Sequence, residues 1–201
     1  MRPISPKVLV EELVERIHAT AAPWVRVAVD GAPAALPGEL ADALVEPLKA
    51  LGRPVVRVSA ADFLRPASLR LEYGRTDPDV FYTDWLDVKA LAREVVGPLA
   101  PGGSGRVLPA LWDSARDRAF RVPYEELPAR GVLLLDGALL LATGLEFEVT
   151  VHLWLSQGAL ARRTPEADRW QLPAFARYDR ERAPADVTVK VDDPRHPATL
   201  E

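Results

Sequence analysis

The stretch that most constrains the fold is residues 25–40, VRVAVDGAPAALPGEL. A short β-branched run ends there at Asp30-Gly31, and after Gly38 apolar residues recur with helical spacing as far as Gly52. A second β-branched run follows at residues 55–58. Strand, turn, helix and strand within about 35 residues have the size of a βαβ unit, which predicts a parallel α/β sheet.

Length and composition bound the class of protein. At 201 residues and 48% hydrophobic, the chain can bury one sizeable core, and we expect a single domain over residues 1–201. No apolar run approaches the ~20 residues that cross a bilayer, and acidic residues near the start argue against a signal peptide, so a cytoplasmic protein without membrane contact is predicted. The net charge of −4 argues against nucleic-acid binding. Without cysteine, and with three scattered histidines, no metal centre built from side chains alone is expected.

The rest of the chain continues the alternation of strands and helices. The most apolar run, residues 131–141, has the length of a central buried strand before Asp136-Gly137. Further strands are predicted at residues 146–155 and 187–191, before a polar tail, and a small hairpin is predicted from residues 107–111 and 119–122. Helices are predicted after Ser5-Pro6, at residues 86–96, after Ser156, and at residues 166–178, where Pro173 should break or kink the helix.

The turn at residues 31–38 has the position of a phosphate-binding P-loop but not its residues. A P-loop has the pattern G-x-x-x-x-G-K-[ST], in which glycine N–H groups, a lysine and a hydroxyl surround the phosphate. Counted from Gly31, the last three of these positions are Leu36, Pro37 and Gly38. Glu39 follows in the first helical turn, where its charge would compete with phosphate. We therefore expect the fold and the chemistry to disagree at this loop.

Five blocks, in order along the chain, carry a resemblance to a known family. They are VRVAVDG at 25–31, VRVSAADF at 56–63, TDPDVFYTDWLD at 76–87, VLLLDGALLL at 132–141 and VHLWLSQGALARR at 151–163. Together they resemble the uridine kinase group of P-loop nucleoside and sugar kinases. The resemblance implies a three-layer αβα P-loop NTPase fold with a five-stranded, mainly parallel sheet, acceptor-side segments over residues 59–130 and a small lid over residues 156–183.

The resemblance also implies ATP and Mg²⁺ as cofactors if the chain is active. Asp30, Gly31 and Gly38 would lie against ATP. Asp136 would be the Walker B acid that holds Mg²⁺ through water, and the alternative is a strand-end aspartate that caps the turn beside Gly137.

Phosphoryl transfer needs a base and cations in addition to these groups. The family's general base falls on Ala61 here, and Asp62 beside it would serve after a one-residue backbone shift. Arg162 and Arg163 match the lid arginines that neutralise the transferring phosphate. The alternative for both is a pair of cations that are favoured at a helix C-terminus.

The acceptor pocket is expected to involve a further group of side chains. Trp112, Asp113 and Arg118 resemble the Tyr-Asp pair and the later arginine that hold a nucleoside in the family. The other candidates for the same wall are Arg65, Arg75, Asp77, Phe81, Tyr82 and Trp85. The alternative is a solvated loop whose aromatic rings pack into the core.

Two functions follow from these residues, and a third stays open. The first is ATP-dependent phosphoryl transfer to a nucleoside or related small hydroxyl acceptor, with Asp62 as base and the two lid arginines as clamps. The second is a degenerate relative that binds a nucleotide, nucleoside or protein partner without transfer, because the P-loop lysine, the hydroxyl and the expected base are replaced. The third is reuse of the cleft for different chemistry. The sequence leaves homo-oligomerisation open.

Overall fold

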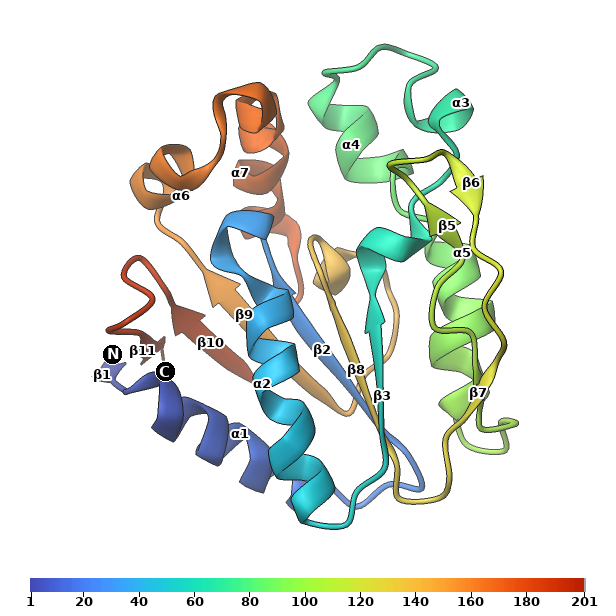
Figure 1. The fold of residues 1–201 in the computed structure, drawn as a ribbon. Helices are drawn as coiled ribbons and strands as arrows, with labels where there is room; N and C mark the ends of the chain where they lie inside the picture. Colours follow the sequence, from blue (N-terminus) through green and yellow to red (C-terminus); the bar gives the residue numbers. More distant parts are fainter. Residues whose placement is uncertain (201) are drawn as a thin grey trace.

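A seven-stranded sheet forms the centre of the computed structural model, which describes residues 1–200 (Figure 1). The strand order is β1-β11-β10-β9-β2-β8-β3. The strands are β1 (Arg2–Pro3), β2 (Val25–Gly31), β3 (Val55–Ser59), β8 (Val132–Gly137), β9 (Val149–Trp154), β10 (Val187–Lys190) and β11 (Ala198–Leu200). The five strands from β10 to β3 run parallel, which confirms the predicted α/β class and its five core strands.

Two short antiparallel strands extend this sheet where only a polar tail was predicted. β11 pairs with β10 through Val189 opposite Thr199, and β1 pairs with β11 through Arg2 opposite Thr199. Both ends of the described chain therefore lie at one edge of the sheet (Figure 1). The tail was missed because its residues lack the β-branched pattern, and its hydrogen bonds come from neighbours distant in sequence.

The strand β2 lies between β8 and β9 and is buried along its whole length. Its Val27 lies beside Leu134 of β8 and Val149 of β9. A strand covered on both faces has mainly apolar residues, as in VRVAVDG and VLLLDG, and the buried Arg26 and Asp30 are paired with Glu148 and His152. The predicted central strands are thus confirmed.

Helices cover both faces of the sheet and make the three-layer arrangement. On one face α1 (Pro6–Ala19) and α2 (Pro37–Ala50) contribute Leu13 and Leu44 to the larger core. On the other face lies α5 (Val88–Leu91), which continues as a π-helical turn (Ala92–Val96) and a 3₁₀ turn (Gly97–Leu99). Pro98 stands at the start of that 3₁₀ turn, so the helix predicted for residues 86–96 ends about one turn later than expected.

The segment predicted as a lid begins as expected and then departs from the prediction. Ser156 caps α6 (Gln157–Arg163) by accepting a hydrogen bond from the Ala159 N–H. A 3₁₀ helix (Glu166–Gln171) precedes α7 (Leu172–Glu181), and Pro173 stands in the first turn of α7. Proline therefore starts a helix here, where its missing N–H costs no hydrogen bond. Beyond the strand ends, α7 lies beside α4 (Pro78–Asp84), which follows the short α3 (Ala67–Arg70) (Figure 1).

The predicted hairpin forms with different pairs. β5 (Trp112–Asp113) pairs with β6 (Arg118–Ala119), and β4 (Arg106–Val107) pairs separately with β7 (Glu125–Glu126). The prediction of residues 107–111 against 119–122 was therefore wrong in register. The cause is the Asp113 carboxylate, which accepts hydrogen bonds from the Ala115 and Arg116 N–H groups and closes the turn directly after β5.

Within residues 1–200, none of the helices has both the length and the apolar character that a membrane crossing requires. The predicted division of the chain into acceptor side and lid stays a prediction.

Candidate functional site

A cavity of about 540 Å³ opens at the carboxyl ends of β2, β3 and β8. This is the end of a parallel sheet at which α/β proteins hold ligands. Its walls are mainly apolar, and its polar groups are few. The apolar lining consists of Pro33, Leu36, Pro37, Ala60, Ala61, Leu64, Phe81, Trp85, Leu86, Ala138 and Leu139, and the polar side chains are Glu39, Asp42, Ser59, Asp136 and Gln171.

The loop after β2 holds its shape through its own hydrogen bonds. The Ala35 N–H donates to the Ala32 carbonyl, and the Leu36 N–H donates to the Pro33 carbonyl. The Glu39 N–H donates back to the Leu36 carbonyl. Pro33 and Pro37 have no N–H group at all. The backbone donors with which a P-loop surrounds phosphate are therefore largely used up or missing in this loop.

Leu36 occupies the position of the closing glycine and adopts its backbone conformation. Its φ angle is 60°, in the left-handed region that favours glycine. The side chain is exposed and lines the cavity. The loop thus makes a left-handed turn at a leucine, and the apolar side chain of this residue lies at the tip of the loop.

Asp136, at the end of β8, is held by a guanidinium group. Arg57 Nη1 donates to Asp136 Oδ1 at 2.6 Å, and Arg57 Nε donates to Asp42 Oδ1 at 2.9 Å. A Cβ added to Gly38 would lie 3.3 Å from Asp136 Oδ2, so the position of the missing P-loop hydroxyl and the predicted Walker B acid are neighbours in space. Gly38 nevertheless offers no hydroxyl, and the carboxylate already has a cation.

These residues do not fit a magnesium site. Mg²⁺ needs several oxygen ligands in a near-octahedral arrangement. Among residues 1–200, no group of three or more histidine, cysteine, aspartate or glutamate side chains is arranged to hold a metal ion. A divalent cation at Asp136 would also have to displace the Arg57 guanidinium.

Asp62, the predicted base, lies on the 3₁₀ turn (Ala60–Phe63) that follows β3. Its neighbour Ala61 lines the cavity, whereas Asp62 is not among the lining residues. Burial raises the pKa of the Asp62 carboxyl, and the negative charges of Asp136 and Asp113 raise it further. Asp62 is therefore half-buried next to a lining residue, and its pKa lies above that of an ordinary aspartate.

The predicted lid arginines lie outside the cavity. Arg163 Nη1 donates to the Val191 carbonyl at 2.9 Å, so its guanidinium binds the segment after β10. Arg162 lies along its own helix, with Nη1 3.3 Å from the place of a Cβ on Gly158. Among the described residues, the cavity lining contains no lysine or arginine.

Nine residues were predicted for the acceptor wall, and seven of them do not line the cavity: Arg65, Arg75, Asp77, Tyr82, Trp112, Asp113 and Arg118. Four of them bind other parts of the protein: Arg65 pairs with Asp84, Tyr82 donates to Glu181, Trp112 donates to Asp117, and Asp113 pairs with Arg116. Asp77 caps α4, and the remaining two, Arg75 and Arg118, are exposed. Their part in binding an acceptor stays a prediction. Of the other candidates for that wall, Phe81 and Trp85 do line the cavity.

An aromatic cluster joins α4 to α7 and the 3₁₀ helix before it. Phe81 of α4 packs edge-on against Trp170 at 5.6 Å and Phe175 at 5.7 Å between ring centroids. Trp85 lies 5.4 Å from Trp170. Phe81 and Trp85 were candidates from the sequence, but only the fold shows that they meet Trp170 and Phe175. The cluster holds α4 against α7 over the cavity.

A buried polar cluster was not foreseen from the sequence. Asp30 is fully buried, and its Oδ2 lies 2.5 Å from His152 Nδ1, while its Oδ1 accepts a hydrogen bond from the Leu140 N–H. Tyr178 joins from α7 by accepting a hydrogen bond from the Leu141 N–H. Burial and the charge of Asp30 raise the pKa of Tyr178, so its hydroxyl stays protonated.

The two glycines and Asp30, all predicted to contact ATP, are placed differently. Gly31 and Gly38 line the cavity, and a Cβ on Gly31 would meet the Leu153 carbonyl at 3.0 Å. Asp30 does not line it, and both of its oxygens have partners inside the protein. Contact between these residues and a nucleotide stays a prediction.

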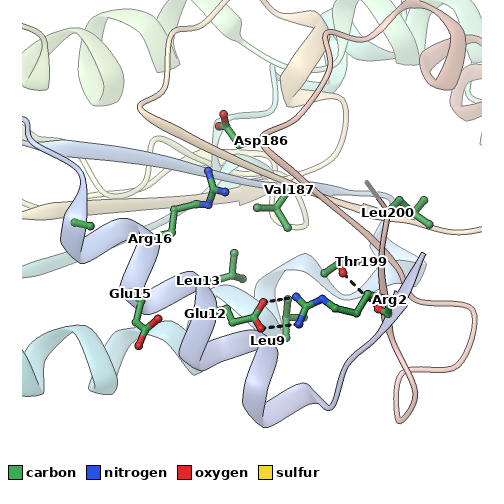
Figure 2. A pocket seen from close by; sticks show the side chains of 11 residues that line it. Arg2, Leu9, Glu12, Leu13, Glu15, Arg16, Asp186, Val187, Thr199 and Leu200 are labelled. Atoms are coloured by element: carbon green, nitrogen blue, oxygen red, sulfur yellow. Dashed lines mark hydrogen bonds and ion pairs between the residues drawn. The ribbon is translucent and has the colours of Figure 1, made fainter.

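A second cavity, of about 560 Å³, lies between α1 and the edge strands β10 and β11 (Figure 2). Its side chains carry both signs of charge. Arg2 reaches across to Glu12 with two hydrogen bonds, of 2.8 and 2.6 Å, and Arg16 extends toward Asp186 and Val187 (Figure 2). None of the residues singled out in the sequence lies there. The first cavity is therefore the candidate site.

Solved structures of two other proteins have a fold similar to that of this chain. The chain superposes on a possible uridine kinase from Bacillus stearothermophilus with a TM-score of 0.73 and 18% identity, covering 90% of this chain and 97% of that one. It superposes on a proposed fructose transport system kinase from Silicibacter sp. TM1040 with a TM-score of 0.66 and 21% identity, covering 92% and 98%. No family model and no curated protein matches the sequence. The predicted uridine kinase-like P-loop fold is thereby confirmed, and identities this low establish the fold alone.

Proposed function

We propose that this chain uses the P-loop kinase fold to bind a small organic molecule in the cavity at its strand ends, without transferring phosphate. The observation that carries the proposal is the cavity lining, in which Glu39, Asp42 and Asp136 are the charged side chains. Phosphoryl transfer depends on neutralising the charge of the phosphates, and this lining offers carboxylates in place of cations.

Electrostatic repulsion disfavours ATP with its phosphates placed against the loop after β2. A carboxylate about 5 Å from a phosphate costs on the order of 3 kcal/mol at an effective dielectric of ~20. Arg57 offsets part of this cost, but its guanidinium is already bonded to Asp42 and Asp136. Position 37 of the loop is proline, so the loop provides no lysine. The N–H groups of Ala35, Leu36 and Glu39 already donate hydrogen bonds to carbonyl groups of the same loop.

The shape and chemistry of the walls support ligand binding. A volume of about 540 Å³ lies within the usual range for small-molecule sites, which are mainly apolar with a few polar groups. Phe81 and Trp85 provide aromatic surface, and their contacts with Trp170 keep the rings in place before any ligand arrives. A preorganised wall lowers the entropy that binding must overcome.

The proposal is tested by measuring turnover and binding on the same protein. Purified full-length chain with ATP and Mg²⁺ should form no ADP above background across a panel of nucleosides, sugars and small alcohols. A library of small organic molecules should contain compounds that raise the melting temperature, because a ligand that binds only the native state stabilises it. ADP formation that depends on one acceptor would contradict the proposal.

Two tryptophan variants locate the binding. Trp85→Ala should remove the ligand-induced rise in melting temperature, since Trp85 lines the cavity. Trp112→Ala is the matched control, because Trp112 lies outside the cavity on β5 and was the residue predicted to stack on a nucleoside. A loss of ligand response in Trp112→Ala alone would place the binding at the predicted acceptor wall instead.

The second candidate is ATP-dependent phosphoryl transfer to a nucleoside or related hydroxyl, with ATP and Mg²⁺ as co-substrates. The observation that favours it is the raised pKa of Asp62, since a general base works best when its pKa approaches the working pH. Under this candidate Asp62 is the base, Arg162 and Arg163 are the clamps, and Asp62→Asn abolishes turnover while ATP binding is retained.

A further inference from the structure

The cavity has an uneven distribution of charge that indicates the kind of ligand it takes. We infer that the ligand is an organic cation, a protonated or quaternary amine carried on an aliphatic or aromatic body. The inference rests on the proposed binding function and specifies the chemistry of the molecule bound there.

Carboxylates gather on one side of the cavity. Glu39 lies in the first turn of α2, Asp42 lies one turn later on the same helix, and Asp136 comes from the end of β8. Residues three apart in a helix project from the same side. The three carboxylates therefore border the cavity, with Glu39 and Asp42 at its solvent-exposed rim and Asp136 deeper inside.

The neighbouring cation does not balance this charge. Arg57 is the basic partner of both Asp42 and Asp136, and within residues 1–200 Glu39 has no ion-pair partner. The positive end of the α2 dipole compensates part of the Glu39 charge, by about half a charge at most. Three carboxylates against one guanidinium leave a net negative wall, which attracts a cation and repels phosphate or carboxylate.

The apolar part of the lining suits the body of an organic molecule. It includes Leu64, Phe81, Trp85, Leu86 and Leu139. The Trp85 ring already has the Arg70 guanidinium 5.0 Å from its centre, so its cation–π partner comes from the protein, and the ring offers aromatic surface to the ligand body. An apolar lining that also carries carboxylates matches a molecule with a hydrocarbon body and a positively charged head.

A metal ion is the other kind of cation, and the structure argues against it. The described part of the chain contains no cluster of three side chains arranged as metal ligands, and the three carboxylates of the cavity do not form one. An ammonium head needs no such coordination geometry. The apolar lining would also be left without a partner by a bare ion.

The test compares three probes with the same body and different heads: 2-phenylethylammonium, 2-phenylethanol and 3-phenylpropanoate. Calorimetric titration of the full-length protein should give an affinity for the ammonium probe about tenfold above that for the alcohol, with the carboxylate weakest. Added salt should reduce the preference, because it screens charges at the surface. Equal or tighter binding of the alcohol or the carboxylate would overturn the inference while leaving the binding function intact.

Charge-removing variants assign the preference to the cavity. Glu39→Gln and Asp42→Asn should each weaken ammonium binding about fivefold and leave alcohol binding unchanged. Glu46→Gln is the matched control, since Glu46 lies on the same helix outside the cavity and pairs with Lys49. Equal effects of all three variants would show that only net charge matters and would overturn the site. If none of the three probes binds, the inference fails, and the library screen decides separately whether the binding function holds.

Discussion

Asp30 and Asp136 end two neighbouring strands and have the same residue after them, yet they serve the protein in different ways. Each is the aspartate of an Asp-Gly pair at the carboxyl end of a buried parallel strand. Asp30 is fully buried and bound to His152, whereas Asp136 borders the cavity and is bound to Arg57. The same dipeptide thus supports the interior in one place and the candidate site in the other.

The register of the sheet explains the difference. Asp30 lies beside Gly137 of β8 and His152 of β9, while Asp136 lies beside Val29 of β2. Paired residues on parallel strands point to the same face, and the side chains alternate along each strand. The two carboxylates therefore face opposite sides of the sheet, and the partners available on each side decide their roles.

The largest effect is expected from removing the buried carboxylate. Asp30→Ala should lower the free energy of unfolding by about 3–5 kcal/mol, because it leaves His152 and the Leu140 N–H without their partner in the interior. Urea denaturation measures this value. The matched control is Asp179→Ala, an exposed aspartate on α7 next to Tyr178, which should change stability by less than about 0.5 kcal/mol. A cost for Asp30→Ala below about 1 kcal/mol would contradict its structural role.

A smaller loss of stability is expected at the cavity. Asp136→Ala should cost about 2 kcal/mol, since it removes a charged hydrogen bond of 2.6 Å but leaves Arg57 paired with Asp42. Arg57 is also 24% exposed, so water replaces part of the lost interaction. The same urea experiment compares the two aspartates directly. A larger cost for Asp136→Ala than for Asp30→Ala would reverse the comparison.

Restoring the P-loop residues tests whether the loop beside Asp136 keeps the geometry of a phosphate site. The triple variant Leu36→Gly, Pro37→Lys, Gly38→Ser should tighten ATP·Mg²⁺ binding at least about tenfold, or ~1.4 kcal/mol, because it supplies the missing cation and hydroxyl beside Asp136.

The control for this triple variant is Ala34→Lys, which adds a lysine to the same loop at a different position. Calorimetric titration of both proteins separates local geometry from net charge. Equal gains in ATP affinity would show that the loop has lost the P-loop arrangement.

The smallest effect concerns a third aspartate, Asp62, whose pKa is raised in part by the charge of Asp136. Burial, Asp136 and Asp113 raise its pKa in the folded protein. A raised pKa means that its stabilising contribution is complete below the ordinary aspartate pKa of about 3.9 and is lost as pH rises through the folded-state pKa. Asp62→Asn should therefore gain stability relative to the natural chain as pH rises over this range, by less than about 1 kcal/mol after solvent screening.

Urea denaturation at several pH values measures this trend. The pH-dependent gain should shrink in an Asp136→Ala background, because one of the charges that raise the Asp62 pKa is gone. An unchanged gain would show that burial alone sets the Asp62 pKa.

Much of the fold could be predicted because its signals are local. The β-branched runs of β2 and β3, the apolar run of β8 and the Ser156 cap each lie within a few neighbouring residues. The edge strands β1 and β11 could not be predicted, since their hydrogen bonds join residues 2 and 199. The hairpin register was missed because the turn is closed by Asp113, a side-chain interaction that strand periodicity does not report.

The candidate site was only partly predictable for a related reason. The altered loop at residues 36–38 and the aromatic rings of Phe81 and Trp85 were identified from the sequence, because the loop pattern is local and the two rings lie within one block of the family resemblance. The role of Arg57 was not, because in the sequence it is an ordinary polar residue within a strand. Its two carboxylate partners come from α2 and β8, and only the packing of these elements brings them together.

The sequence by itself determined the parallel α/β class, the central strands and the loss of the P-loop lysine and hydroxyl, because chain periodicity and residue identity carry that information. The tertiary structure alone decided which charges meet. It buried Asp30 against His152, paired Asp136 with Arg57, and placed an apolar cavity with carboxylates at the strand ends. The physical reason is that electrostatic and polar partners act over a few ångströms of space, and strand register and helix packing set those distances.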